Sequence, residues 1–467
     1  MSLLIVGLDN TIVNVALPSI GRDLHTSVSG LQWTVDAYTL VLASLLMLSG
    51  SMGDRLGRKR VFSLGLVLFT LGSLLCSVAP SLGALIAFRM MQAVGGSMLN
   101  PVAMSIIRNV FTDARERAQA IGMWGATVGI SLALGPVVGG ALVESVGWRS
   151  IFWINIPVGL SALALTLRFV PESRAPHPRR LDAVGQVLVI ALFSSLTYAI
   201  IEAPSAGWLS AQSLGLFGVA LLALVLLLAY EPRRREPLLE LRFFRSVPFS
   251  SASAIAVCSF AALGGFLFLN TLYLQEVRGL SAVQAGLCTL PIAAMTLIFA
   301  PLSGRIVGSR GPRVGLLVGG AGIALGSALL TGLGAHTSIP SLVPAYLIFG
   351  IGFGMVNPPI TNTAVLGMPP AQAGVAAAVA STSRQLGQTL GVAIVGAVTA
   401  AGAVSVGAGF VQASHTGWWI TTGCGVAVFA LGLASTTERA NVSARHVAEE
   451  LDGQDGAAPP KAQLARV

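Results

Sequence analysis

The stretch Gly50–Arg60, which reads GSMGDRLGRKR, decides how this chain is organised. It carries one acid and four bases in its last seven residues, and it joins two apolar runs, Leu40–Met52 and Val61–Val78. Lys and Arg resist translocation across a membrane, so a basic loop between two membrane-length helices is predicted to lie on the cytoplasmic side. The runs on both sides of it are therefore expected to be transmembrane helices.

The composition is that of a polytopic membrane protein. Hydrophobic residues make up 54% of the 467 residues, charged residues make up 10%, and the mean hydropathy is +0.79. A soluble globular chain carries about 25% charged residues. Several apolar runs also reach the roughly 20 residues that a helix needs to cross the hydrocarbon core. The soluble classes are thereby excluded.

The net charge of +9 follows membrane topology. Of the 28 Lys and Arg residues, 23 fall in predicted cytoplasmic segments or at their edges, three (Arg22, Arg149 and Arg278) in predicted outer loops, and two (Arg89 and Arg384) deep inside predicted spans. This distribution does not predict binding to nucleic acid. The four cysteines and five histidines are dispersed, so the sequence predicts neither a metal site nor a disulfide.

Fourteen membrane spans are predicted in this all-α chain. Their ranges are 1–20, 33–52, 61–79, 83–107, 118–142, 150–170, 183–202, 213–230, 249–272, 284–304, 314–334, 342–362, 374–400 and 418–436. An even number places both termini on one side, and the basic loops put that side in the cytoplasm. The polar tail 437–467 is predicted to be a disordered cytoplasmic segment.

An internal repeat divides the chain. The run Pro301–Arg313, PLSGRIVGSRGPR, is a weaker second copy of the opening stretch, and its Gly304 corresponds to Gly53. The offset fits six helices plus two inserted ones. The predicted parts are an N-terminal six-helix half (1–170), two inserted helices with their linkers (171–248), a C-terminal six-helix half (249–436) and the tail (437–467).

These features resemble the major facilitator superfamily. Its signature between the second and third helices is G-x-x-x-D-R-x-G-R-[KR]-[KR], which Gly50–Arg60 matches throughout. The run Leu8–Pro18, LDNTIVNVALP, closely resembles the signature of the superfamily's fourteen-span drug/proton antiporters. The resemblance covers nearly the whole chain. It implies two six-helix halves plus two inserted helices, with the substrate site between the halves near the midplane of the membrane.

Asp9 lies midway along the first predicted span. A carboxylate there costs roughly 2.5–3.5 kcal/mol, so it should face a cavity or a partner. Burial favours the neutral acid and a nearby cation favours the carboxylate, so an acid balanced between them can take up and release a proton. The resemblance implies proton coupling, and the alternative is a structural hydrogen-bonded Asp. Asn14, in the same run, is assigned to substrate binding.

A second acid, Asp36, is predicted one turn inside the outer end of the second span, near Trp33 and Tyr38. Some members of the antiporter family carry an acid here, which implies selection of organic cations. The two aromatic rings would add cation–π contact. All three are assigned to substrate binding. The alternative is an interfacial belt of Trp and Tyr with a solvated Asp.

Arg89 lies in the fourth predicted span, in the run LIAFRMMQAVGG at 85–96. This run resembles the superfamily's buried arginine motif, which is linked to proton transfer. A guanidinium does not deprotonate, so Arg89 would bias a carboxylate and hold a polar network. The alternative is an arginine that snorkels to the interface. In the thirteenth span, Arg384 and Gln385 are assigned to the cavity, with structural pairing as the alternative.

The fifth span carries the run GISLALGPVVGG at 129–140. Its Gly129, Gly135, Pro136, Gly139 and Gly140 are spaced as in the superfamily's antiporter motif. Small residues let helices approach closely, and a proline removes a backbone hydrogen bond. The resemblance implies export, because the motif is unusual in nutrient symporters. Ordinary glycine packing is the alternative.

The opening stretch is assigned to a gate. Its charged residues would bridge the two halves at the cytoplasmic face when the carrier opens outward, and would separate when it opens inward. The assigned residues are Asp54, Arg55, Gly57, Arg58, Lys59 and Arg60. A topology signal alone is the alternative, although it leaves the acid and the glycines without an explanation.

The sequence predicts a proton-coupled antiporter that exports amphipathic, cationic drugs or toxic compounds across the cytoplasmic membrane. The alternatives are a dedicated exporter of an endogenous antibiotic, lipid or metabolite, a nutrient/proton symporter, and a non-transporting sensor or enzyme. No G-x-x-x-x-G-K-[ST] run occurs, so the proton gradient is the expected energy source and no cofactor or catalytic residue is assigned. Arg outnumbers Lys 26 to 2, which suggests a GC-rich bacterial genome. A monomer is expected because one chain contains both halves.

Overall fold

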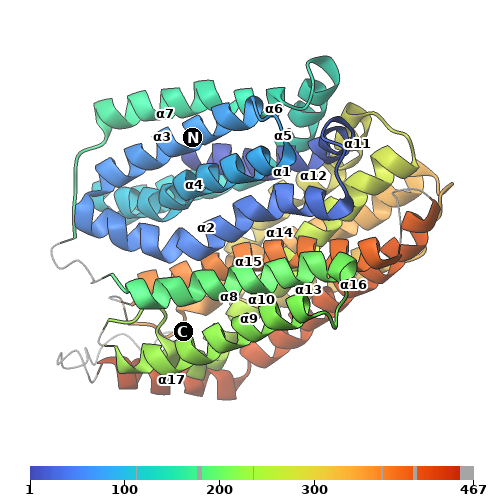
Figure 1. Ribbon diagram of the computed structural model, residues 1–467. Coiled ribbons are helices and arrows are strands. Elements are labelled where there is room, and N and C mark those ends of the chain that lie inside the picture. The colour runs from blue at the N-terminus through green and yellow to red at the C-terminus, as the bar shows by residue number, and fades with distance from the viewer. Residues whose placement is uncertain (112, 176–180, 235, 370–371, 403–407, 453–467) are drawn as a thin grey trace.

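The structure is a bundle of long helices. The computed structural model describes residues 1–467 except 112, 176–180, 235, 370–371, 403–407 and 453–467. The described residues form helices and turns and contain no strand. The N half extends from α1 to α7 and the C half from α10 to α16, and the inserted pair α8–α9 separates them in the chain. In Figure 1 the N half lies above the C half, and α8 and α9 run along the front.

The helices of the N half are α1 Ser2–Asp23, α2 Val28–Leu56, α3 Arg58–Ser77, α4 Leu82–Val110, α5 Ala114–Ser145, α6 Ser150–Trp153 and α7 Asn155–Phe169. The inserted pair is α8 Ala183–Ala206 and α9 Ala211–Tyr230, followed by the short helices η1 Glu231–Arg233 and η2 Leu241–Arg245. The C half contains α10 Val247–Leu272, η3 Tyr273–Val277, α11 Ala282–Cys288, α12 Leu290–Arg310, α13 Arg313–Ala328, η4 Ile339–Leu342, α14 Val343–Val365, α15 Ala373–Gly402 and α16 Ala408–Ser435. The last helix is α17 Glu438–Asp452.

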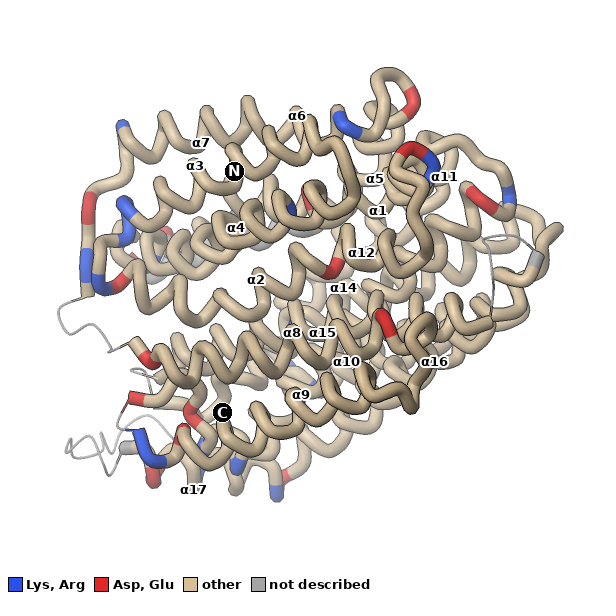
Figure 2. Tube along the Cα trace, in the orientation of Figure 1, with Lys and Arg blue, Asp and Glu red and all other residues tan. Residues whose placement is uncertain are grey.

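The charged residues gather toward the two ends of the bundle (Figure 2). The junction of α2 and α3, residues 53–60, marks one end, which is called the basic end below. The segment that follows α7 lies at the same end, because the Arg58 amide donates to the Ser173 carbonyl oxygen over 2.9 Å. The other end, where α1 meets α2 and α5 meets α6, is called the opposite end.

Twelve helices in the described part of the chain are long and apolar enough to cross a membrane. The sequence predicts fourteen spans, and this number is not reached. The two predicted spans that fall short are 118–142 and 314–334. In α5, a helix of 32 residues, the apolar segment with described side chains is Gly129–Ser145, and α13 has 16 residues. At 1.5 Å per residue, 16 helical residues extend about 24 Å, which is less than the hydrocarbon thickness of about 30 Å.

Glycine allows the helices to approach closely within each half. A Cβ atom on Gly95 of α4 would collide with the backbone of α3 at Phe69, and one on Gly391 of α15 would collide with the Ala261 carbonyl oxygen of α10. Lipid gives no hydrophobic drive for one helix to bind another, so such backbone approach and its van der Waals contacts stabilise the bundle. The same argument applies to α13 and α14, where Gly322 faces Gly352.

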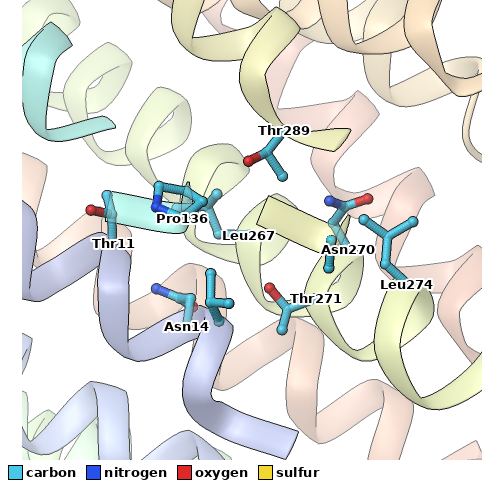
Figure 3. A pocket seen from close by; sticks show the side chains of 10 residues that line it. Thr11, Asn14, Pro136, Leu267, Asn270, Thr271, Leu274 and Thr289 are labelled. Atoms are coloured by element: carbon cyan, nitrogen blue, oxygen red, sulfur yellow. The ribbon is translucent and has the colours of Figure 1, made fainter. Parts of the chain in front are cut away.

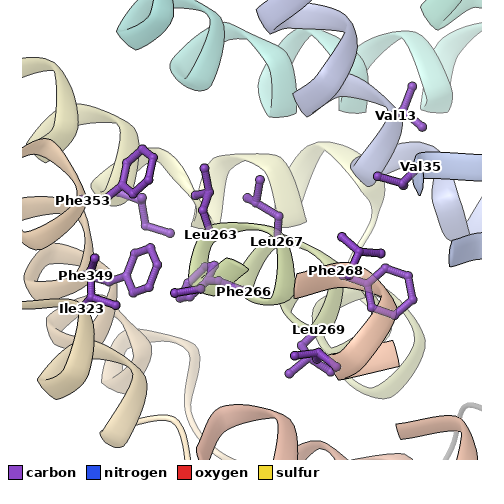
Figure 4. Close-up of a cluster of buried hydrophobic side chains, with 14 of the residues drawn as sticks. Val13, Val35, Leu263, Phe266, Leu267, Phe268, Leu269, Ile323, Phe349 and Phe353 are labelled. Carbon is purple, nitrogen blue, oxygen red and sulfur yellow. The ribbon is translucent and has the colours of Figure 1, made fainter. Parts of the chain in front are cut away.

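Aromatic side chains fill the centre of the C half (Figure 4). The ring of Phe266 on α10 lies 4.5 Å from that of Phe349, 5.5 Å from that of Tyr346 and 5.4 Å from that of Trp418. All four side chains are buried. On the other side of α10, Val13 and Val35 of the N half complete the cluster. Helix α10 therefore connects the C-half core to the N half.

The predicted disordered tail is wrong for residues 438–452, which form α17. Its buried residues Ala440, Ala444, Val447 and Leu451 recur at helical spacing and make an apolar stripe. The stripe packs on α10 and η2, and Arg245 pairs with Glu450 over 2.9 Å. The helix was not predicted because these four apolar residues lie in a segment that is otherwise mostly polar. Residues 453–467 lie outside the described part of the chain.

The glycine contacts predict that Gly391→Leu prevents α10 and α15 from packing. Overpacking typically costs about 1–3 kcal/mol, and a clash with backbone costs more because backbone cannot rotate away. Gly423→Leu on α16 is the matched control, since nothing lies within 4 Å of a Cβ at that position. Size-exclusion chromatography and the thermal midpoint of the detergent-extracted variants should show loss of folded protein for Gly391→Leu alone. Equal behaviour of the two variants would contradict this account of the packing.

Candidate functional site

A buried ion pair lies inside the N half. Asp9 of α1 and Arg89 of α4 are both fully buried, and Arg89 Nη1 donates to Asp9 Oδ2. The two residues are 80 positions apart in the chain. An isolated charge at this depth is costly, and a partner of opposite sign offsets part of that cost. The structure thus brings together the two residues that the sequence assigns to proton coupling.

Three polar side chains complete the network around Asp9. Gln92 Nε2 and Asn155 Nδ2 each donate to Asp9 Oδ1 over 2.9 Å. Ser73 accepts from both amides, over 3.3 Å from Gln92 and 3.0 Å from Asn155. These three residues were not assigned from sequence. In the sequence, each of them is visible only as a polar residue within an apolar run, and this pattern does not show which residue it will contact.

Arg89 also holds α2. Its Nε donates to the Thr34 carbonyl oxygen over 3.3 Å, and its guanidinium carbon lies 4.3 Å from the centre of the Tyr38 ring. A guanidinium stacks well on an aromatic face, and the contact strengthens where water is excluded. One nitrogen, Nη2, has no hydrogen-bond partner among the described residues. Five helices, α1, α2, α3, α4 and α7, therefore meet at the Asp9–Arg89 pair.

The three residues of α2 that were assigned to one substrate site face three different neighbours. Trp33 donates from Nε1 to Glu202 of α8 over 2.8 Å, and Tyr38 lies against Arg89. Asp36 lies on the face of α2 that also carries Gln32 and Thr39. Successive helical residues are 100° apart, so neighbours in sequence point in different directions. The structure does not bring Trp33, Asp36 and Tyr38 together.

Asp36 lies in the seam between α2 and α15. One turn before it, Gln32 Nε2 donates to the carbonyl oxygens of Val392 and Ala393, over 3.3 Å and 2.9 Å. One turn after it, Thr39 accepts from the Thr389 hydroxyl over 2.8 Å. Asp36 itself is fully buried, and neither carboxyl oxygen has a hydrogen-bond partner among the described residues. Burying a polar group without a hydrogen-bond partner is costly.

The α5 glycine motif packs on two sides. Toward α1, a Cβ on Gly135 would collide with Thr11, and one on Gly139 would collide with Ile12. Toward the C half, a Cβ on Gly140 would meet the Ala282 carbonyl oxygen of α11. The other two motif residues also face the C half. A Cβ on Gly129 would collide with Leu297 of α12, and the Pro136 carbonyl oxygen lies where a Cβ on Gly286 of α11 would be. The motif thus forms one of the two seams between the halves.

A small cavity lies between the halves beside this motif (Figure 3). Thr11, Asn14 and Pro136 line it from the N half, opposite Thr289 and residues of α10, η3 and α11. The facing residues are Leu267, Asn270, Thr271, Leu274 and Ala285. The volume is about 10 Å³, room for one water molecule, whereas drug-sized ligands need roughly 300–1,000 Å³. Asn14, as assigned, lines the cavity, which is closed to a larger ligand.

Two residues of α15 that were assigned to the cavity do not line it. Arg384 donates to Ser381 of its own helix, over 3.3 Å, and to Thr361 of α14. Gln385 is half-buried, and its backbone carbonyl oxygen accepts a hydrogen bond from the Thr389 hydroxyl. The next turn is closer to the N half, since Gln388 accepts from Asn10 over 3.4 Å. The structural-pairing alternative for Arg384 describes its observed contacts.

The halves are joined at the opposite end and midway. Arg22 pairs with Glu276 over 2.7 Å, and Gln275 donates to the Val15 carbonyl oxygen over 2.9 Å. A hollow of about 250 Å³ remains at this end, lined by Arg22, Glu144, Gln275 and neighbouring residues. At the basic end, the contacts of Asp54 with Arg58, of Arg60 with Glu172 and of Lys59 with Leu167 stay within the N half and the segment that follows α7.

The sequence profile of the Major Facilitator Superfamily matches residues 1–392. The chain belongs to the Major Facilitator Superfamily. Members of this superfamily are transporters and not enzymes, so the chain is a multi-pass membrane transporter of small molecules. Its two halves, with a cavity between them, are the arrangement that such carriers use for substrate.

Resistance and export proteins are among the relatives of this chain. Multidrug resistance protein Stp of Mycobacterium tuberculosis is 38% identical over 401 residues, which cover 86% of this chain and 74% of Stp. The Tetracenomycin C resistance and export protein of Streptomyces glaucescens is 36% identical over 405 residues, with the same two coverages of 86% and 74%. A bacterial homolog of the human lysosomal transporter Spinster shares the fold, with a TM-score of 0.65 over 95% of this chain and 96% of that one, at 19% identity.

The described contacts of the superfamily signature at the α2–α3 junction are with the N half and with the segment that follows α7. Asp54 pairs with Arg58 over 2.8 Å, and Lys59 Nζ donates to the Leu167 carbonyl oxygen over 2.8 Å. Glu172, which was not assigned from sequence, pairs with Arg60 over 3.6 Å. Its carboxylate also lies 2.6 Å from where a Cβ on Gly57 would be, and Gly57 has a φ of +113° that favours glycine. Arg55 is exposed. In this structure the assigned gate residues do not bridge the halves.

The buried pair predicts that replacing Asp9 alone lowers stability more than replacing Asp9 and Arg89 together. Asp9→Asn leaves the Arg89 charge uncompensated, which typically costs about 3–5 kcal/mol, whereas Asp9→Asn with Arg89→Gln removes both charges. We expect the single variant to have the lower thermal midpoint in detergent. Glu450→Gln, which removes the exposed pair with Arg245, is the control and should change stability by less than about 1 kcal/mol. A double variant less stable than Asp9→Asn would contradict this assignment.

Proposed function

We propose that this chain is a proton-coupled antiporter of the fourteen-span drug/proton branch, which exports amphipathic, cationic compounds. The observation that carries the proposal is the fully buried Asp9, an acid that can carry a proton, bound to Arg89 inside the N half. The α5 glycine motif, which lies between the halves, supports export. The relatives named for multidrug resistance and for tetracenomycin C resistance and export support the same direction.

The proposed topology contains fourteen spans. Helix α5, with 32 residues, and helix α13, which the turns at 329–332 lengthen, cross in addition to the twelve long apolar helices. Both pack as members of the halves, α5 against α1 and α13 against α14 and α16. We place the basic end, both termini and α17 in the cytoplasm, because Lys and Arg concentrate in cytoplasmic loops. The structure is then shut at the outer face and belongs to the inward-facing part of the cycle.

In the proposed cycle, the inward-facing carrier takes substrate from the cytoplasm or the inner leaflet. The Asp9 proton leaves toward the cytoplasm, and Arg89 then pairs with the carboxylate, as in the structure. The halves rock, and the substrate leaves at the outer face. A proton from outside then neutralises Asp9 and weakens its ion pair with Arg89. The junction at 53–60 would bridge the halves while the carrier faces outward.

Inside-out vesicles with an acid interior test this coupling. Adding an ethidium-like cation should make wild-type vesicles dissipate the proton gradient, because each substrate that enters the lumen drives protons out. Asp9→Asn should lose this response, since an amide cannot carry the proton. Asp9→Glu should restore part of it. The amount of folded variant in the membrane and its affinity for the same cation, measured after solubilisation, separate loss of coupling from loss of fold. Full coupled export by Asp9→Asn would remove the core of the proposal.

Asp36 is proposed as the residue that selects cations. It lies in the α2–α15 seam, and opening of this seam at the outer face would expose its carboxyl to substrate. We expect Asp36→Asn to weaken binding and export of cations by about tenfold, which corresponds to about 1.4 kcal/mol, and to leave neutral substrates unchanged. Parallel export assays with one cationic and one neutral compound make the comparison. Equal losses would show that selection is not its role.

A dedicated exporter of a neutral metabolite is the second candidate, and the lining of the cavity favours it. Thr11, Asn14, Asn270, Thr271 and Thr289 provide hydrogen-bonding groups but no charge. Such a site suits an uncharged compound with hydrogen-bonding groups at least as well as a cation. If neither wild type nor Asp9→Asn responds to a panel of cations in the vesicle assay, while cells still exclude a neutral compound, this second function replaces the first.

A further inference from the structure

Two buried acids meet at the base of the inserted pair α8–α9. Asp182 is the N-cap of α8 and is 4% exposed, and Glu231 follows the end of α9 and is 1% exposed. Asp182 Oδ1 accepts from the Gly185 amide over 2.9 Å and from the Tyr230 hydroxyl over 3.2 Å. Asp182 Oδ2 and both oxygens of Glu231 have no hydrogen-bond partner among the described residues.

The free oxygens converge on one point beside Gly185. A Cβ atom on Gly185 would lie 2.6 Å from Glu231 Oε1 and 3.0 Å from Asp182 Oδ2. The two oxygens are thus no farther apart than these two distances together. One ion with metal–oxygen bonds of about 2.0–2.6 Å can bridge such a span. Gly185 leaves open the space that any side chain would fill.

The basic side chains nearby that the structure describes are directed elsewhere. Arg233 donates to the Ala229 carbonyl oxygen, and the Arg234 guanidinium lies 5.4 Å from the centre of the Tyr230 ring. Glu240, a third acid near Glu231, pairs with Arg242 over 2.8 Å. The backbone amides of Leu238 and Leu239 approach the Glu231 carboxyl, but outside hydrogen-bonding geometry. Between described residues, no cation offsets the repulsion between the two buried carboxyls.

We propose that Asp182 and Glu231 form a binding site for a small divalent metal ion, Mg²⁺ or Ca²⁺. The donors are carboxylate oxygens, which hard cations prefer. Two buried carboxylates that face each other without a cation are costly, and a bound ion reverses that cost. The ion joins the first turn of α8 to the last turn of α9 at the basic end, and so closes the base of the inserted pair. The site is separate from Asp9 and from the cavity between the halves.

Terbium luminescence tests the site on the purified full-length protein after treatment with a chelator. Tb³⁺ is a luminescent substitute for Ca²⁺, and Tyr230, which is bonded to Asp182, is positioned to sensitise it. Wild type should show saturable sensitised emission that Ca²⁺ or Mg²⁺ displaces, and both ions should raise the thermal midpoint. Glu231→Gln should lose both responses. Tyr230→Phe should lose most of the emission and keep the stabilisation.

Two further variants make the result decisive. Glu450→Gln removes an exposed acid at the same end and should behave as wild type. Gly185→Ala keeps both carboxyls but places a methyl group 2.6 Å from Glu231 Oε1 and 3.0 Å from Asp182 Oδ2, so it should displace these oxygens and weaken the ion response if Glu231→Gln does not fold. The proposal is overturned if Glu231→Gln or Gly185→Ala retains the full wild-type response to the ions. It is also overturned if acidification alone stabilises the wild type and neither ion does, because the two carboxyls then share a proton.

Discussion

The cost of burying charge in a membrane protein governs the N half. Asp9 and Arg89 are fully buried, and together they draw side chains or backbone from α1, α2, α3, α4 and α7 into one polar network. Because each charge is stable only with its partners in place, the five helices are held in one mutual arrangement. Helix α2 contacts both this polar network and the C half. One face receives Arg89 at Thr34 and Tyr38, and another forms the seam with α15. A change at the ion pair therefore acts directly on an element that also contacts the C half.

Two kinds of contact hold the molecule together, and they differ in strength. Within each half, glycines let backbones touch, as Gly95 does on α3 and Gly391 does on α10. Between the halves, the seams combine such contacts at α5 with a few hydrogen bonds from Gln32, Gln275 and Thr389. Closely packed helices resist deformation, whereas a seam with few polar contacts can open without disrupting either core. This difference is what two rigid halves that rock against each other require.

The sequence was sufficient for the membrane-protein class, the superfamily and the presence of two charges, Asp9 and Arg89, inside the bundle, because each of these has a local sequence signal. A charge in an apolar run is visible without a structure. The partners of Asp9 were not predictable, since Ser73 and Asn155 come from distant helices and nothing in their neighbourhood identifies Asp9. The grouping of Trp33, Asp36 and Tyr38 failed for a geometric reason, because helical rotation directs them to α8, α15 and α4. The α17 helix was missed because its four apolar residues are diluted in a polar segment.

The inserted pair makes the two seams of the carrier unequal. Helix α8 packs against both α2 and α15, so it covers the seam that contains Asp36, and no inserted helix covers the α5 seam. Among the described residues of α2 and α15, helix α8 forms side-chain hydrogen bonds with α2 only. Gln186 donates to the Ser44 carbonyl oxygen over 2.7 Å, and Glu202 accepts from Trp33 over 2.8 Å. These contacts are about 24 Å apart along α8, at 1.5 Å per residue. Breaking hydrogen bonds away from water is costly, whereas apolar surfaces can slide over each other with little loss. Any rocking of the halves is therefore easiest at the α8–α15 surface, which makes the inserted pair mechanically part of the N half.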